Sequence, residues 1–195
     1  MNINITIRGT NALLLHKYTT ATVSGPKARV IKSREATMYD DEWIKSTYLN
    51  KEGHVVMPSL NIIACLFDGS KGMKIGKKAI TRILYTSLFV TPFEPVVMGD
   101  EKPITINDIR KNDWLDRRGA VISGRRIDRT RTMLPLGWTL SFVISTKDSS
   151  LSKEDIKAVL ENAGTSAGLG DWRPSSPKKP GPYGTFAVVS FEEVK

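Results

Sequence analysis

The pattern of hydrophobic and polar positions predicts several strands. Isoleucines alternate with polar residues over 3–8, and a period of two is typical of a strand with one buried face. A short apolar run follows at 12–15. The clearest alternation covers 138–145, and the apolar segment 186–191 ends in another predicted strand. The first and last elements of the fold are therefore expected to be strands.

Helical spacing appears in two longer stretches. After Pro58 and Ser59, apolar residues at positions 60, 63, 64 and 67 predict a helix that ends near Gly69. Ser152 and Asp155 resemble a capping box, and apolar residues at 156, 159, 160 and 163 predict a second helix that ends at Gly164. Between them, the sequence indicates a further helical segment around 80–84 and two short strands at 88–90 and 96–98, which prolines make bent or edge-like.

The order of these elements predicts the fold class. Strand, helix and strand in the first half, followed by strand, helix and strand in the second, form a βαββαβ series. This order is typical of an α+β, ferredoxin-like (RRM-like) fold, an antiparallel sheet with two helices on one face. We expect one domain over 1–195, with long projecting insertions at about 19–51 and 101–132. One face of the sheet is then open to a ligand.

Charge and composition narrow the classes of function. The chain has a net charge of +9 and 40% hydrophobic residues, which favours a globular protein with a polyanionic partner, nucleic acid first and an anionic membrane surface second. The absence of a long apolar run or a leader-like start predicts a cytoplasmic protein without a membrane span. The single Cys65 lies in an apolar run, so we expect a buried reduced thiol, with no disulfide, metal site or cofactor.

Basic residues form two clusters. The denser cluster covers 110–131, where arginines can grip phosphates through two hydrogen bonds each. The alternative is a solvated surface whose arginines pair with Asp113, Asp116 and Asp128. The second cluster, 69–78, resembles a P-loop, but its glycine spacing is wrong and no Ser or Thr follows the lysine, which excludes a nucleoside triphosphatase. Contact with a nucleic-acid backbone or another subunit fits this cluster better.

A glycine- and proline-rich loop separates the second helix from the last strand. Its glycines allow unusual backbone geometry and close approach of another chain, while Trp172 offers a stacking surface among cations. The alternative is an ordinary proline-rich surface loop. The loop glycines of interest are Gly168, Gly170, Gly181 and Gly184. The predicted nucleic-acid-binding residues are Lys17, Lys74, Lys77, Lys78, Arg117, Arg118, Arg125, Arg126, Arg129, Arg131, Trp172, Arg173, Lys178 and Lys179.

Three stretches resemble the RAMP (repeat-associated mysterious protein) superfamily, especially the backbone subunits of CRISPR effector complexes. In the first stretch, 5–17, the first strand runs into Leu-His-Lys. The second stretch is similar to the family's helix start and reads Val-Met-Pro-Ser-Leu-Asn-Ile-Ile-Ala at 56–64. The third, 169–188, resembles the family's glycine-rich loop and following strand. The resemblance implies sequence-independent binding of RNA, or other single-stranded nucleic acid, along its backbone. It also implies a homo-oligomer or ribonucleoprotein subunit with a role in antiviral defence.

Two alternatives stay open beside this non-catalytic role. His16 with Tyr18 could support metal-independent RNA cleavage, as in guide-processing members of the superfamily. The simpler interpretation is a strand-end histidine with an ordinary hydrogen bond. Asp41, in the acidic group 40–42, could correspond to the loop aspartate of subunits that cut target RNA. The last alternative is a phage or mobile-element protein that mimics a subunit and binds a protein complex.

Overall fold

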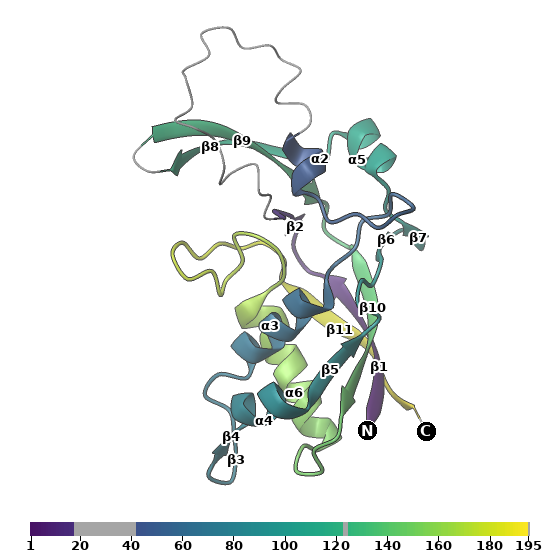
Figure 1. The fold of residues 1–195 in the computed structure, drawn as a ribbon, viewed down its shortest axis with the longest axis vertical. Helices are drawn as coiled ribbons and strands as arrows, with labels where there is room; N and C mark the ends of the chain where they lie inside the picture. Colours follow the sequence, from purple (N-terminus) through teal and green to yellow (C-terminus); the bar gives the residue numbers. More distant parts are fainter. Residues whose placement is uncertain (18–41, 123–124, 195) are drawn as a thin grey trace, which may run out of the picture.

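The main antiparallel sheet forms the lower part of the molecule. A computed structural model describes residues 1–17, 42–122 and 125–194, and side chains are described outside 120–127. The sheet has the order β11–β1–β10 (Figure 1). Along the edge of β10 that faces away from β1, the first residues of β10 pair with β6 and its last residues pair with β5. The strand β7 pairs with β6. These strands are β1 (Asn2–Gly9), β5 (Leu88–Thr91), β6 (Val97–Gly99), β7 (Lys102–Pro103), β10 (Thr139–Thr146) and β11 (Phe186–Val194).

Helices cover one face of this sheet and enclose the core. The alternation of β1 places Ile3, Ile5 and Ile7 against the helices, each at most 2% exposed. The predicted strands and helices of this part are confirmed, including the Ser152 capping box, in which Ser152 and Asp155 exchange hydrogen bonds. The fold is therefore α+β with an antiparallel sheet. The covering helices are α3 (Ser59–Gly69), α4 (Ile80–Ser87) and α6 (Lys153–Asn162).

The second helix continues beyond its predicted end at Gly164. A π-helical turn, η2 (Ala163–Ala167), extends α6, and Gly168 with φ of 72° ends it. Gly164 serves close packing instead, because a Cβ atom there would collide with the carbonyl oxygen of Phe186. The prediction of the helix end was wrong because a glycine that permits close approach looks the same in sequence as a glycine that stops a helix.

The opposite face of the sheet carries mainly polar side chains, with the exposed Phe89 of β5 opposite Ser145 of β10. Asn4, Thr6 and Arg8 of β1 point away from the helices, beside Ser141 and Ser145 of β10. The hydroxyl groups of Thr6 and Ser141 lie 2.9 Å apart in a hydrogen bond across the two strands. This face has no helix over it within the described part of the chain.

A second, smaller assembly stands above the sheet. The strands β8 and β9 form a long hairpin that extends away from the body. Leu13 and Leu14, which follow β1, pair with the base of this hairpin (Figure 1). The short β3–β4 hairpin lies at the other end of the molecule. The elements of this paragraph are β2 (Leu13–Leu14), β3 (Lys74–Ile75), β4 (Lys78–Ala79), β8 (Leu115–Ile122) and β9 (Arg125–Leu134), with α2 (Glu42–Ser46) and α5 (Ile106–Asn112) beside the long hairpin.

Two further predictions concern the core and the membrane. Cys65 is a free, buried cysteine on α3, as predicted, and burial raises the pKa of its thiol to about 12. Most of the predicted insertion at 19–51 lies outside the described residues. Among the described residues, the helices are too short and too polar to cross a bilayer.

Candidate nucleic-acid interface

The glycine-rich loop is fastened to the base of the long hairpin through β2. The Asp171 amide donates to the Leu14 carbonyl at 2.7 Å, and the Gly184 amide donates to the Ala12 carbonyl at 2.8 Å. Gly170 has a φ of 77°, and a side chain there would collide with the Leu14 carbonyl. The loop glycines thus bring the loop against the protein's own strand and place it beside β8 and β9.

A buried carboxylate joins the two strands of the hairpin. Asp116 is 4% exposed and accepts hydrogen bonds from Arg118 and Arg131, whose Nη2 atom lies 2.7 Å from Asp116 Oδ2. Asp116 and Arg131 are paired in the register of β8 and β9, so they share one face of the hairpin. That face is turned toward the glycine-rich loop.

Arg131 also connects the hairpin to the loop. Its Nη1 atom donates to Asp171 Oδ2 at 2.8 Å, and its Nε atom is buried without a partner in the described residues. Hydrogen bonding from His16, reinforced by Arg131, lowers the pKa of Asp171 to about 2 against the opposing effect of burial. Asp171 is therefore ionised at neutral pH, and its carboxylate holds loop and hairpin together.

His16 continues this network on its other side. Its Nδ1 lies 3.5 Å from Asp171 Oδ2, and its Nε2 lies 3.2 Å from Arg129 Nη1, which in turn meets Glu42 at 3.4 Å. Because a guanidinium can only donate, Nε2 acts as the acceptor and Nδ1 carries the proton. Both ring nitrogens are thus engaged inside the protein, so His16 could act as a general base only after breaking one of these contacts.

Trp172 stacks on groups of the protein itself. The Arg118 guanidinium carbon lies 5.1 Å from the centroid of the Trp172 ring and 5.6 Å from that of Tyr183, and Arg118 also donates to the Tyr183 hydroxyl. Gly181 packs against the indole, where a Cβ would collide with it. Trp172 is therefore the base of a stack whose next layer is the half-exposed Arg118 side chain.

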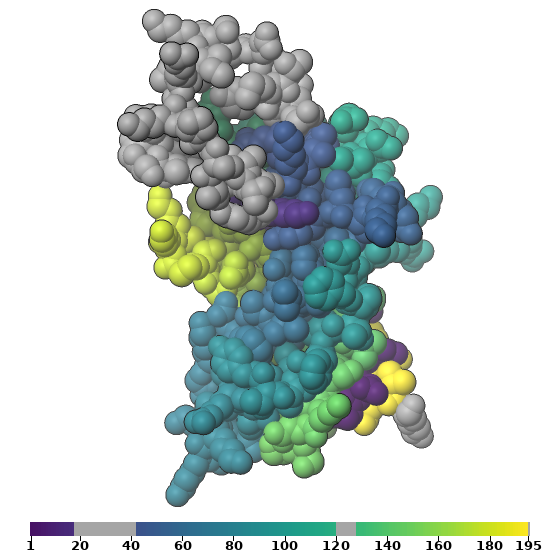
Figure 2. Space-filling view, viewed as in Figure 1, coloured from purple at the N-terminus to yellow at the C-terminus, as the bar shows by residue number. Residues whose placement is uncertain are grey.

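These residues form one wall of a cleft of about 610 Å³ between the hairpin and the loop. Five cationic side chains and one carboxylate line it, and Asp116 and Asp68 also pair with its arginines, so the excess positive charge comes mainly from the two lysines. Lys178 and Lys179 are exposed, and the described residues offer them no ion pair. Figure 2 shows the loop, in yellow-green, standing out from the body beside α3. The lining residues are Arg118, Gly119, Arg131, Asp171, Trp172, Arg173, Ser176, Pro177, Lys178 and Lys179.

The structure thus brings together two predicted clusters, the arginines of the hairpin and the cations of the loop. Within this group, Arg129 and Arg131 have structural partners, whereas the loop lysines are available to a ligand. Arg117 lies at the surface and pairs with Asp113, with 2.8 Å between Nη2 and Oδ1. Arg125 lies in β9 opposite Ile122 near the tip of the hairpin, and the Arg125 and Arg126 side chains lie outside the described ones.

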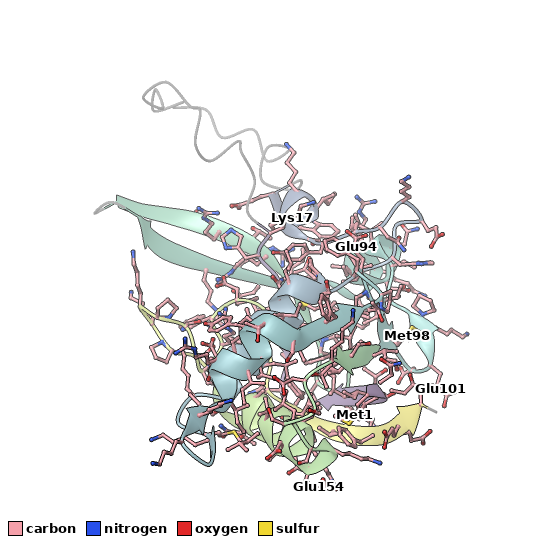
Figure 3. All side chains as sticks on the ribbon, turned by 60° about the horizontal axis from the view of Figure 1, so that its bottom comes forward. Met1, Lys17, Glu94, Met98, Glu101 and Glu154 are labelled. Carbon is pink, nitrogen blue, oxygen red and sulfur yellow. The ribbon has the colours of Figure 1, made fainter. Side chains whose placement is uncertain are left out.

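The other predicted residues lie elsewhere. Lys74 and Lys78 belong to the β3–β4 hairpin and Lys77 to its turn, at the opposite end of the molecule from β8 and β9. Lys17 is exposed beside α2, on the side of the long hairpin, while Met1 and Glu154 mark the other end (Figure 3). Asp41 and Tyr18 lie outside the described residues. In the described ranges, no three His, Cys, Asp or Glu side chains are grouped so that they could hold a metal ion.

Sequence reasoning missed the residues that position the cations. Asp116 and Asp171 are the buried and half-buried anions of the network, and Tyr183 is the aromatic partner of Arg118. Asp116 was considered only as a partner that neutralises a surface arginine. Its position opposite Arg131 follows from the hairpin register, which a strand prediction for 115–134 would have revealed.

Comparison with protein-family models and with curated protein sequences finds no match to this chain.

Proposed function

We propose that this protein binds single-stranded RNA, or another single-stranded nucleic acid, along its phosphate backbone as a RAMP-like subunit of a ribonucleoprotein. The proposal includes a ferredoxin-like fold. The strand order β11–β1–β10–β5, with α3 and α6 as the two crossovers on one face, supports this part. The RAMP-like sequence stretches at 5–17 and 169–188 support it further, because they meet where the loop docks on β2.

The observation that carries the proposal is the cationic cleft between hairpin and loop. It combines arginines that the protein fixes with two lysines that have no ion pair among the described residues. Both residue types bind phosphate, lysine as a mobile point charge and arginine as a rigid donor. The carboxylates nearby are already neutralised by arginines, so they oppose an incoming polyanion only weakly. An open cleft with an excess of positive charge also concentrates a polyanionic ligand.

The stack on Trp172 provides a contact for bases. Bases stack on aromatic rings and on guanidinium planes, with about 1–3 kcal/mol for each aromatic stack. Arg118 is fixed on Trp172 and Tyr183 and held by Asp116, and its side chain is 43% exposed. Its outer face therefore offers a preorganised plane at the edge of the cleft. Such a contact tolerates every base, which fits binding without sequence preference.

The proposal is tested by fluorescence anisotropy with a labelled single-stranded RNA over a range of salt concentrations. For each phosphate neutralised, log K should fall by about 0.7 per log unit of salt. Lys178→Ala/Lys179→Ala should weaken binding and reduce this slope by roughly 1.4 if each lysine meets one phosphate. Size-exclusion mass with and without RNA measures the proposed self-association.

The matched control is Lys74→Ala/Lys77→Ala, which removes the same charge from the β3–β4 hairpin. This variant should keep nearly the affinity and salt slope of the unmodified protein. Absence of binding at low salt rejects the function. Equal losses in both variants would mean that net charge, and not the cleft, attracts the nucleic acid.

A further inference from the structure

A second, smaller hollow opens beside the cationic cleft. It has a volume of about 180 Å³ and lies between α3, the segment after α2 and the glycine-rich loop. Asp171 and Arg173 line both this hollow and the cleft, so the two are neighbours along one path. Its remaining walls are His16, Tyr48, Asn61, Ala64, Gly168, Leu169 and Gly170.

The size of the hollow limits what it can hold. Its volume equals that of roughly six water molecules in the liquid, and it is smaller than the usual site for a drug-sized ligand. It is too narrow for a stretch of nucleic-acid backbone, but it has room for one planar ring. Because the hollow adjoins the cleft, a nucleic-acid strand bound in the cleft could place one of its bases in the hollow.

The walls of the hollow offer hydrogen-bond groups that the protein leaves unused. The Asn61 amide nitrogen makes only a long contact of 3.7 Å to the Met57 sulfur, and the described residues give its carbonyl oxygen no partner. The Tyr48 hydroxyl, also in this wall, has no hydrogen bond in the described part of the chain. Both side chains are half-buried, so their hydrogen-bond groups are within reach of a ligand that enters the hollow.

Asn61 and Tyr48 can each donate or accept a hydrogen bond in this hollow, whereas the Asp171 carboxylate can only accept. Asp171 accepts from Arg131, His16 and the Trp172 amide, and a carboxylate with about four lone-pair sites can accept once more. All three guanidinium nitrogens of Arg173 already face groups of the protein, namely the Gly170 carbonyl, the Ser175 hydroxyl and, at 3.9 Å, the Asp68 carboxylate. Asp171 therefore decides the preference of the hollow. Acceptors recognise the exocyclic amino groups of bases, as carboxylates do with cytosine N4.

We propose that this hollow is a base pocket that takes one nucleobase of the bound strand and prefers bases with an exocyclic amino group over uracil. This inference rests on the proposed function, but it adds a selective position to otherwise sequence-independent binding. Asn61 and Asp171 accept from the amino group, and Tyr48 bonds to a second position on the edge of the base.

The test compares two oligonucleotides, oligo(rC) and oligo(rU), of about ten nucleotides, which is within the usual site size of single-strand binders. The two bases differ at the 4-position, where cytosine carries an amino group and uracil an oxygen. The protein should bind oligo(rC) about tenfold more tightly than oligo(rU). Asn61→Ala and Tyr48→Phe should each bring the ratio toward one, while affinity for oligo(rU) changes little.

The outcomes separate the base pocket from the proposed function. Equal affinity for both oligonucleotides, with binding still lost in Lys178→Ala/Lys179→Ala, rejects the pocket and leaves the cleft in place. A preference for oligo(rC) that survives in both Asn61→Ala and Tyr48→Phe also rejects the pocket, as does an equal loss of affinity for both oligonucleotides in these variants. If neither oligonucleotide binds at all, both proposals are wrong.

Discussion

The body of the protein and the junction between hairpin and loop are held together by different forces. In the body, the sheet and α3 and α6 enclose isoleucine and leucine side chains that are almost fully buried. In the junction, the buried Asp116 pairs with the half-buried Arg131, and the contacts are ion pairs and hydrogen bonds. Apolar contacts depend on volume and area, whereas ionic contacts depend on direction, charge and pH. The junction is therefore the part that charge changes can alter without unfolding the body.

The largest loss of stability should come from a cavity in the body. Leu140→Ala, at a fully buried position of β10, should lower the free energy of unfolding by about 2–5 kcal/mol. Urea denaturation measures this loss, which should change little with salt. Ser141→Ala, on the exposed face of the same strand, is the control and should cost no more than about 1 kcal/mol, because it removes only the exposed hydrogen bond to Thr6. Similar costs for the two variants would contradict the arrangement of the sheet faces.

A smaller loss should follow removal of the buried anion in the junction. Asp116→Asn leaves Arg131 and Arg118 without their shared carboxylate and should cost about 1–3 kcal/mol in urea denaturation. Asp113→Asn removes the exposed pair with Arg117 and should cost clearly less, because solvent screens that pair. An Asp113 variant that is as damaging as the Asp116 variant would contradict a special role for the buried network.

Acid should weaken the junction within a defined range of pH. The pKa of Asp171 is about 2 in the folded protein, below its ordinary value of 3.8. Because the pKa is lower in the folded state, the ionised carboxylate stabilises the fold fully when the pH is above the ordinary pKa of the group. This contribution is lost as the pH falls toward 2. The unmodified protein should therefore lose stability more steeply than Asp171→Asn between pH 3.8 and 2. Parallel urea midpoints for both proteins across this range would contradict the assignment.

The smallest effect on stability is expected from the lysines of the cleft. Lys178→Ala/Lys179→Ala removes exposed side chains without ion pairs in the described residues, so the free energy of unfolding should change by no more than about 0.5 kcal/mol. Thermal denaturation beside an RNA titration separates folding from binding. If the double variant lost as much stability as Asp116→Asn, these lysines would belong to the structural network.

The elements of the body were predictable from sequence, whereas the junction was not. The strands β1 and β10 and the helices α3 and α6 each bury one face, so their apolar residues follow a visible period. The long hairpin carries arginines along both strands and buries little apolar surface, so 115–134 shows no such period. Its ion pairs join segments far apart in sequence, such as Arg131 with Asp171, and local patterns hold no information on such contacts.

Candidate ligand residues were predicted by type but not by role. A sequence count treats Arg129 and Arg131 as equal to Lys178 and Lys179, although only the lysines lack internal partners in the described residues. Likewise, Trp172 was predicted as a free stacking ring, and the structure places Arg118 over it. The sequence can indicate that cations and a ring are present, but packing decides which of them face a ligand.

Ultraviolet cross-linking of a mixed-sequence single-stranded RNA, followed by mass spectrometry of the peptides, tests the location of binding most directly. The account predicts adducts in the loop 170–183 and in the hairpin strands at 115–134, and their loss in Lys178→Ala/Lys179→Ala. Adducts confined to the exposed face of the sheet or to the β3–β4 hairpin would contradict it.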